Sequence, residues 1–465
     1  MKMGKKSVPA GRRFESSLPR QRGAALLIFS IIIVMAALAY LVSSLAPDLS
    51  EARRERKSQE ALAQAREALI GYALTYRDRK PDLMYGYLPM PDIGRRGTTN
   101  DENCHDALNR PLEGCQAPPS PSDISKVDGA YLPTLVGRFP WRTLGMPPLR
   151  DGHGECLWLI VSSSVLSGNA SQTNIPFNWD TLGYLDIHVA NDNSALQSLF
   201  ANKPHDRPWA IVYSPGPPLP GQDRSDKVNG DDVTECGGNY DARNYLDPYI
   251  LNALGDIRNS LANTHNASDD PNDFTYRKTN PIKVTTDGKV FKSGSNYLPN
   301  ACQGADCTLL ANDRGLILSG DKLFDVIRNK RSEFRADIDN LLEKITDCLS
   351  GAVSDPSCSI GAAPDTSGFA QPADKTVGRV VDNTYYDDTK LPKGYWSHYR
   401  EMLFHVKPNS GNLNVNGKPC TGALIFGSQR NSRWESAGES SGNTPKCPKD
   451  NPANPYQCRV TVGDK

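Results

Sequence analysis

The residues with the clearest chemical potential are a histidine and a cysteine in one short turn. His153 and Cys156 lie in the sequence HGEC, and a cysteine beside a histidine can act as an activated nucleophile. A disulfide is the stronger interpretation of Cys156, because the chain has eleven cysteines and the first stands at position 104. We therefore expect Cys156 to be bonded rather than catalytic.

The spacing of the other cysteines favours local bridges formed in an oxidising compartment. The candidate pairs are Cys104–Cys115, Cys302–Cys307, Cys348–Cys358 and Cys447–Cys458. Spacing alone leaves the connectivity open, and the odd total leaves one cysteine over. CxxC is absent and the seven histidines are dispersed, so no spacing resembles a zinc site.

Oxygen ligands cluster around a glycine in the segment DKVNGDD. Asp226, Asn229, Asp231 and Asp232 are there, and hard cations such as calcium favour such oxygen ligands. The spacing differs from that of an EF-hand loop, so a solvated acidic turn is the favoured interpretation. Calcium is the one cofactor that the sequence suggests.

Signatures of enzymes are weak. The chain has no HExxH, no phosphate-binding loop and no dinucleotide glycine loop. His398 and His405 are seven residues apart and could share a helical face, but surface or core roles are favoured for both. We expect a protein that is not an enzyme.

Charge and composition exclude some classes of protein. The 465 residues include 53 Lys and Arg against 53 Asp and Glu, so no global basic field exists to bind nucleic acid. The 38 glycines and 35 prolines indicate that loops dominate over long regular elements.

One apolar segment must position the rest of the chain. Residues 24–46 carry no charge and are long enough to cross a hydrocarbon core of about 30 Å as a helix. The preceding residues hold seven basic side chains and one acid, Glu15, which predicts a cytoplasmic N-terminus and an exported remainder. Pro47 follows the only small-x-small site, so cleavage there as a secretory signal is disfavoured.

The junction before this segment resembles the class III leader of type IV pilins and type II secretion pseudopilins. The matching residues are Arg20-Gln21-Arg22-Gly23, followed directly by Ala24-Ala25-Leu26-Leu27-Ile28. The resemblance implies that prepilin peptidase cuts between Gly23 and Ala24 at the cytoplasmic side, that Ala24 is methylated, and that the helix contacts other pilins. A plain signal anchor is the alternative.

The residues after the segment fit this resemblance. Residues 47–80 are rich in helix formers, and Leu62, Ala65, Leu69, Tyr72 and Tyr76 step by three and four residues along one face. We expect a helix of some 55 residues whose second half packs on a globular head, as in pilins.

The fifth position after the cleavage site departs from the pilin pattern. Most pilins have a glutamate there that pairs with the N-terminal amine of a neighbouring subunit, whereas this chain has Ile28. The pseudopilin that caps the secretion pseudopilus also lacks the acid. The resemblance therefore implies a tip or minor position in the filament.

We expect the exported part to be an α+β head with insertions over residues 81–350, a loop-rich linker or insertion over 351–395, and strands followed by a disordered or truncated tail over 396–465. Short apolar runs predict buried strands at 157–161, 210–213 and 423–426, and helical spacing predicts one helix over 321–349. Residues 263–312 and 350–395 lack periodicity and predict long loops.

Four fragments of the head resemble a poorly characterised proteobacterial family of large pilin-like proteins. They span 137–161, 208–225, 236–247 and 312–318. The prediction is thus a minor pilin-like subunit in the inner membrane, with its head in the periplasm. The alternative is a membrane-anchored periplasmic protein that never polymerises, either a binding module or a hydrolase with an unrecognised site.

Overall fold

The chain folds into two units in a computed structural model, one of residues 1–55 and one of residues 56–465. Within the first helix, α1 (Ala24–Arg79), the described side chains exclude those of residues 24–26 and 37–48. The structure describes residues 24–81, 83–94, 104–116, 134–166, 177–179, 181, 183, 185–190, 196–200, 206–225, 235–247, 275–276, 282–284, 289–294, 296–299, 302, 304–350, 366, 371–380, 395–399 and 402–427.

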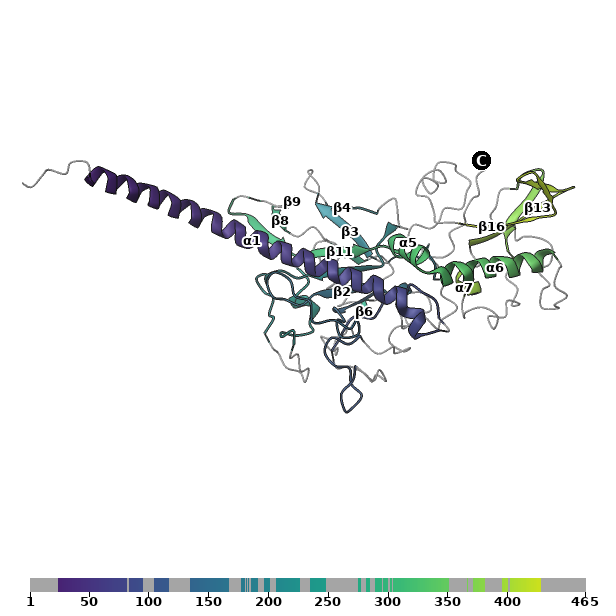
Figure 1. Cartoon of the computed structure of the whole chain (residues 1–465), viewed down its shortest axis with the longest axis horizontal. Coiled ribbons are helices and arrows are strands. Elements are labelled where there is room, and N and C mark those ends of the chain that lie inside the picture. Colours follow the sequence, from purple (N-terminus) through teal and green to yellow (C-terminus); the bar gives the residue numbers. More distant parts are fainter. Residues whose placement is uncertain are drawn as a thin grey trace, which may run out of the picture. The chain divides into compact units, whose positions relative to one another are not determined.

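The fold class is α+β, as predicted, and its centre is a five-stranded antiparallel sheet in the order β11-β5-β2-β1-β6 (Figure 1). The strands are β1 (Thr134–Arg138), β2 (Trp158–Ser162), β5 (Ala210–Ser214), β6 (Thr275–Tyr276) and β11 (Arg314–Leu318). The predicted runs at 157–161 and 210–213 form β2 and β5, which are buried along their whole length.

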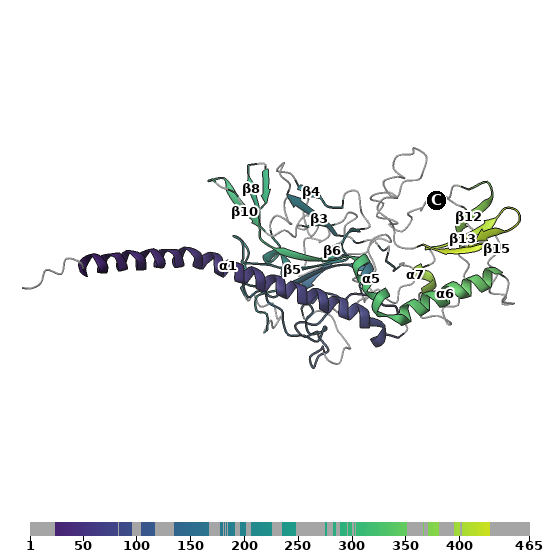
Figure 2. The same ribbon diagram turned by 45° about the horizontal axis from the view of Figure 1, so that its top comes forward.

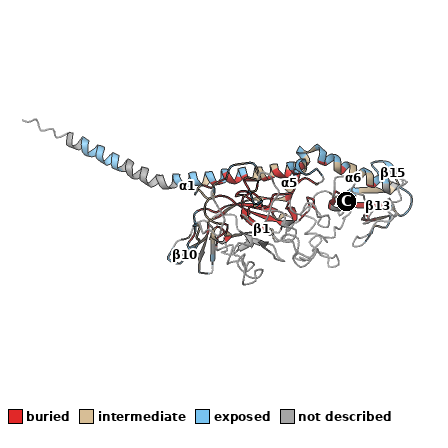
Figure 3. Cartoon of the chain, turned by 90° about the horizontal axis from the view of Figure 1, so that it is seen from below, coloured by how far each residue is buried: buried red, intermediate tan, exposed pale blue. Residues whose placement is uncertain are grey.

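Helix α1 (Ala24–Arg79) covers one face of this sheet with its residues from 56 onward (Figures 1 and 3). The predicted apolar stripe of α1 is buried, and its side chains share a core with Leu159 and Val212 of the sheet. The stripe consists of Leu62, Ala65, Leu69, Tyr72 and Tyr76. The helical period places these residues on one side, while the outer side of this part of α1 is exposed in Figure 3.

The opposite face of the sheet packs on a second apolar cluster. Side chains alternate along each strand, so Trp158 and Ile160 point away from α1 while their neighbour Leu159 points toward it. The second cluster is closed by Tyr245 and Leu246 from the loop of residues 235–247. Both faces of the sheet are therefore covered, and this loop is part of the core.

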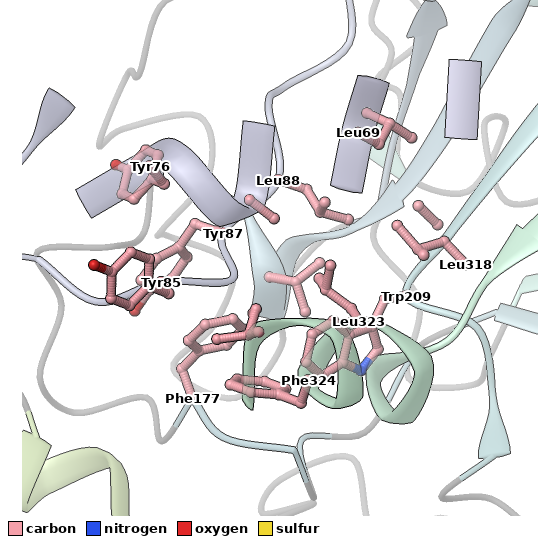
Figure 4. Packing of buried hydrophobic residues seen from close by; sticks show 14 of the residues in the cluster. Leu69, Tyr76, Tyr85, Tyr87, Leu88, Phe177, Trp209, Leu318, Leu323 and Phe324 are labelled. Atoms are coloured by element: carbon pink, nitrogen blue, oxygen red, sulfur yellow. The ribbon is translucent and has the colours of Figure 1, made fainter. Parts of the chain in front are cut away.

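Aromatic side chains fill the space between α1, the sheet and helix α5 (Gly320–Lys330) (Figure 4). Phe177 stacks on Tyr87 with ring centroids 4.1 Å apart, and its ring lies 5.5 Å from that of Trp209. Phe324 of α5 meets Trp209 edge to face at 5.7 Å. These rings have at most 1% of their surface exposed, so they form the centre of the core.

The predicted single helix over 321–349 is wrong, because two helices occupy this region. Helix α5 ends at Lys330 and α6 (Ser332–Ser350) begins two residues later, with Arg331 extended at φ −117° and ψ 100°. The break lets Phe324 and Phe334 enter the same core with ring centroids 6.0 Å apart. Arginine is a good helix former, so its residue type gave no sign of the break.

Two ion pairs, one at this break and one within α6, connect the end of α1 to this region. Arg77 of α1 pairs with Asp337 of α6, and Asp78 of α1 accepts a hydrogen bond from Arg331 at 2.7 Å. The side chains of Arg77 and Asp337 are only 19% and 15% exposed. Their pair is thus partly desolvated, whereas the Arg56–Glu60 pair on α1 is 82% and 57% exposed.

Replacing Asp337 by alanine is expected to lower the free energy of unfolding by about 2 kcal/mol, because Arg77 would keep its charge without its partner. Glu60→Ala is the matched control, and its effect is expected to stay below about 0.5 kcal/mol because exposed pairs contribute little. Denaturant titration of the full-length chain measures both. Equal losses in the two variants would contradict the assignment of Arg77–Asp337 as the stabilising contact.

A small sheet lies within residues 263–312, which were predicted to be loop, so that prediction is wrong for its strands. This sheet has the order β10-β8-β9, with β8 (Val290–Ser293), β9 (Asn296–Pro299) and β10 (Cys307–Ala311). A second small sheet has the order β4-β3-β7, with β3 (Leu185–Ala190), β4 (Leu196–Ser198) and β7 (Ile282–Val284), and only β7 comes from the predicted loop. Strands this short give too few residues for a period to be visible.

A third small sheet lies at the C-terminal end of the described residues, beside α6 and α7 (Tyr395–Tyr399) (Figure 2). Its order is β12-β13-β16, with β12 (Lys375–Arg379), β13 (Leu403–Pro408) and β16 (Ala423–Phe426). A strand occurs at 423–426, as predicted, but it is not buried, and Ile425 is 43% exposed. Strand β12 corrects the prediction of loop over 351–395. The remaining elements are the hairpin β14 (Leu413–Val415) and β15 (Lys418–Cys420), with the short 3-10 helices η1 (Ser163–Val165) and η4 (Ala242–Asn244).

Candidate functional site

The unit of residues 1–55 presents an apolar surface on α1. All described side chains of residues 27–36 are exposed. The large apolar ones, 52% to 64% exposed, are Leu27, Ile28, Phe29, Ile31, Ile32, Ile33, Val34 and Met35. They lie all around the helix, a pattern of helices that are normally covered by other protein or by lipid.

The predicted processing site lies at the start of this surface. Ala24 is the first residue of α1, and Ile28 is 58% exposed. Gly23 and the leader of residues 1–22 lie outside the described residues. Over the side chains that the structure describes, no helix offers an apolar stretch long enough to cross a membrane.

Loop 235–247 is the second candidate feature, because distant parts of the chain hold it in place. A disulfide joins Cys236 to Cys156, 80 residues earlier in the sequence. The carboxylate of Glu113 accepts hydrogen bonds from the backbone nitrogens of Glu235 at 2.8 Å and Cys236 at 2.7 Å. Arg150 donates to the carbonyl oxygens of the same two residues. The loop therefore begins at a fixed position.

Two glycines allow the loop to turn at this point. Gly237 and Gly238 have φ angles of 72° and 73°, which side chains of L residues rarely adopt. A Cβ atom on Gly238 would also lie 2.0 Å from the hydroxyl of Tyr245. The positive φ angle thus favours glycine at both positions, and the close approach of Tyr245 also requires it at Gly238.

Arg138, at the end of β1, holds the middle of the loop. Its Nη2 donates to the carbonyl oxygens of Gly237 at 2.6 Å and Asn239 at 2.7 Å. The guanidinium carbon lies 5.9, 5.0 and 5.4 Å from the ring centroids of Trp158, Tyr240 and Tyr245. Cation–π attraction to these rings offsets part of the cost of burying the charge.

Asp92 connects the loop to the segment that follows α1. Its carboxylate accepts hydrogen bonds from the backbone nitrogens of Gly94 at 2.9 Å and Gly114 at 2.7 Å, and from the hydroxyl of Tyr240 at 3.0 Å. Complete burial raises the pKa of Asp92 to about 7, although these donors and Arg138 oppose the shift. Asp92 is therefore partly protonated near neutral pH.

Asp247 ends the described part of the loop and binds the turn between β10 and β11. It accepts hydrogen bonds from the backbone nitrogens of Asn312 and Asp313, and its own backbone nitrogen donates to Asp313 Oδ2 at 3.2 Å. Asp247 and Asp313 have no exposed surface. Groups so deeply buried can position the loop but cannot meet a substrate from solution.

The cysteines bear out part of the sequence interpretation. Cys104–Cys115 and Cys302–Cys307 are bonded, as predicted. Cys156 is bonded to Cys236, so its thiol is not available as a nucleophile, and His153 beside it is exposed. Cys420 is the one free thiol among the described side chains. The bridges Cys348–Cys358 and Cys447–Cys458 involve residues outside the described part.

The two histidines that could share a helical face do not do so, and the calcium candidates lie outside the described residues. His398 lies on α7 and His405 on β13, so they share no helical face, because the chain changes from helix to strand between them. The calcium candidates Asp226, Asn229, Asp231 and Asp232 lie outside the described residues. Among the side chains that are described, no group of three His, Cys, Asp or Glu could hold a metal ion.

Sequence reasoning missed Asp92, Glu113, Arg138 and Arg224 as members of one arrangement around loop 235–247. The available signal was the set of four fragments at 137–161, 208–225, 236–247 and 312–318. They carry Arg138, Arg224, the loop and Asp313, and the fold brings them together at the sheet. No family model, curated protein or solved structure matches the chain.

Proposed function

We propose that this chain is a minor pilin-like or pseudopilin-like subunit, processed by prepilin peptidase after Gly23 and incorporated into a type IV pilus or secretion pseudopilus. The observation that carries the proposal is the exposed apolar surface of residues 27–36, which begins four residues after the RQRG sequence. A surface of this kind needs a lipid or protein cover. In a pilin-type subunit, lipid covers this part of the helix before assembly, and neighbouring subunits cover it in the filament.

The second part of α1 supports the same architecture. If a subunit is held in a filament by its N-terminal helix, that helix must be firmly attached to the head. Leu62, Leu69 and Tyr76 are buried in the core of the head, and Arg77 pairs with α6. The helix is therefore an integral part of the head over residues 56–79, and not a linker attached to it.

Charge and cysteine chemistry support a single-pass inner-membrane protein with a cytoplasmic N-terminus and a periplasmic head. Seven basic residues precede position 24, and such residues remain on the cytoplasmic side. The three disulfides found among the described residues lie in the head, and such bonds persist in oxidising compartments. Its partners would be prepilin peptidase and other pilins or pseudopilins.

Ile28 favours a minor or tip position. An exposed isoleucine at this position offers no charge to the N-terminal amine of a subunit above it. A subunit at the tip has no such neighbour, so the acid is not needed there. Burial of the apolar helix surface alone would hold the subunit on the ones below.

Replacing Gly23 by leucine is expected to keep the leader attached and to remove the protein from sheared filaments, because the peptidase cleft accepts a glycine at the cut. Gly11→Leu, in the same leader but away from the cut, is the control and should be processed and assembled normally. Immunoblots of the filament and membrane fractions measure the result. Wild-type protein that never enters the filament fraction would favour the non-polymerising, membrane-anchored alternative.

A further inference from the structure

We propose that Asp247 and Asp313 share one proton in the native protein, and that this proton holds the end of loop 235–247 on the turn between β10 and β11. This inference does not depend on processing or filament assembly, because it concerns the head alone. It assigns to the two buried acids a pH-sensitive contact between parts of the chain that are 66 residues apart.

The positions of the two carboxyl groups are fixed by the backbone. Asp247 accepts from the nitrogens of Asn312 and Asp313, and Gln222 Nε2 lies 3.3 Å from Asp247 Oδ1. Asp313 Oδ2 accepts from the nitrogen of Asp247. Each acid thus binds the backbone of the other's segment, and this reciprocal pairing places the carboxyl groups within hydrogen-bond reach of each other.

If both acids are ionised, one buried carboxylate oxygen of the pair has no hydrogen-bond donor. Asp313 Oδ1 is buried and has no hydrogen-bond partner, because a carboxylate next to it cannot donate. A proton on either acid converts the contact into a carboxyl–carboxylate hydrogen bond, which is among the stronger kinds. A single proton therefore supplies the missing donor.

The charges around the pair also favour one proton. Arg224 is the cation that acts on both carboxyl groups. It is itself shared, because its Nη1 lies 3.4 Å from Glu155 Oε1 and its Nε donates to the carbonyl oxygen of Asn244. Three carboxylates would thus face one guanidinium in a buried setting, and adjacent like charges in such a setting disfavour full ionisation.

The pKa values of both acids are raised, first by burial and, for Asp313, next by the charge of Asp247. The folded state therefore binds more protons than the unfolded chain above the ordinary aspartate pKa. The stabilisation is full below that pKa and is lost as the pH rises through the folded values. We therefore expect the contact between the end of loop 235–247 and the turn between β10 and β11 to become weaker as the pH rises.

Hydrogen exchange of the backbone amides in residues 235–247 tests this expectation in the full-length chain in detergent. After correction for intrinsic exchange, the opening constant of the wild type should rise with pH, by at most about tenfold per unit for each proton released. Asp313→Asn places a neutral amide that can donate to Asp247, so its opening constant should depend less on pH. Asp374→Asn, at a side chain 76% exposed, is the control and should behave as wild type.

Infrared spectroscopy gives a readout that needs no variant. At pH 8, where Asp92 with its pKa of about 7 is mostly ionised, wild-type protein should show the carbonyl band of a protonated acid that shifts on ¹³C-aspartate labelling. Absence of this band, or an unchanged pH dependence in Asp313→Asn, would overturn the proposal. Slower opening on addition of Ca²⁺ at alkaline pH would overturn it too, since a cation and not a proton would then join the acids.

Discussion

The double variant Cys156→Ala/Cys236→Ala is expected to lose about 4 kcal/mol of unfolding free energy relative to the wild type, because the bond closes a long loop in the unfolded chain. The two cysteines are separated by 80 positions. Removing the bond frees the unfolded chain, while Glu113 and Arg150 still bind the start of loop 235–247 in the folded state. Denaturant titration of the full-length chain measures the loss.

Cys302→Ala/Cys307→Ala is the matched control for this effect. These cysteines are separated by only 5 positions, so the same entropy argument gives a loss of roughly 2 kcal/mol. The ratio of the two losses in unfolding free energy shows whether the stabilisation depends on the length of the closed loop. A loss at Cys302–Cys307 equal to that at Cys156–Cys236 would contradict the account of the longer bridge as a constraint on the unfolded head.

Phe324→Ala is expected to destabilise the head by about 3–5 kcal/mol, the cost typical of removing a buried phenylalanine and leaving a cavity. The ring is fully buried and contacts Phe177, Trp209 and Phe334. Phe29→Ala removes a ring that is 64% exposed, so it should leave the stability of the head unchanged. Near-ultraviolet circular dichroism during denaturation follows the aromatic core in both variants. A cost below about 1 kcal/mol for Phe324→Ala would mean that the cluster repacks.

The parts of the fold with a clear local apolar pattern could be predicted from the sequence. The buried face of α1 and the strands β2, β5 and β16 occur where this pattern places them, although β16 is not buried. The signal is local in each case, because the buried face of a helix repeats every three to four residues and a strand covered on both faces is a continuous apolar run. The break at Arg331 escaped prediction because the apolar stripe continues on both sides of it.

Contacts between distant residues could not be predicted in this way. Strand β6 has two residues and pairs with β1, which lies more than a hundred positions earlier. The partner of Cys156 was likewise open, because eleven cysteines allow many pairings. The arrangement around loop 235–247 depends on Asp92, Arg138 and Asp313, and no local pattern links these three residues.

The loop and the apolar helix surface have different roles in this account. Loop 235–247 closes one face of the sheet and stabilises the head. The described side chains of residues 27–36 are exposed and take no part in that core, and under the proposed function they contact lipid or neighbouring subunits. Substitutions in the two regions should therefore separate stability from assembly.

The mass of the mature N-terminal peptide, from cells with and without prepilin peptidase, tests the central claim most directly. We predict an N-methylated peptide that begins at Ala24 and occurs only in cells with the peptidase. The protein would then enter the pilin pathway by the RQRG leader. Residues 1–23 still attached in both strains would contradict the claim and would make residues 24–46 a simple membrane anchor.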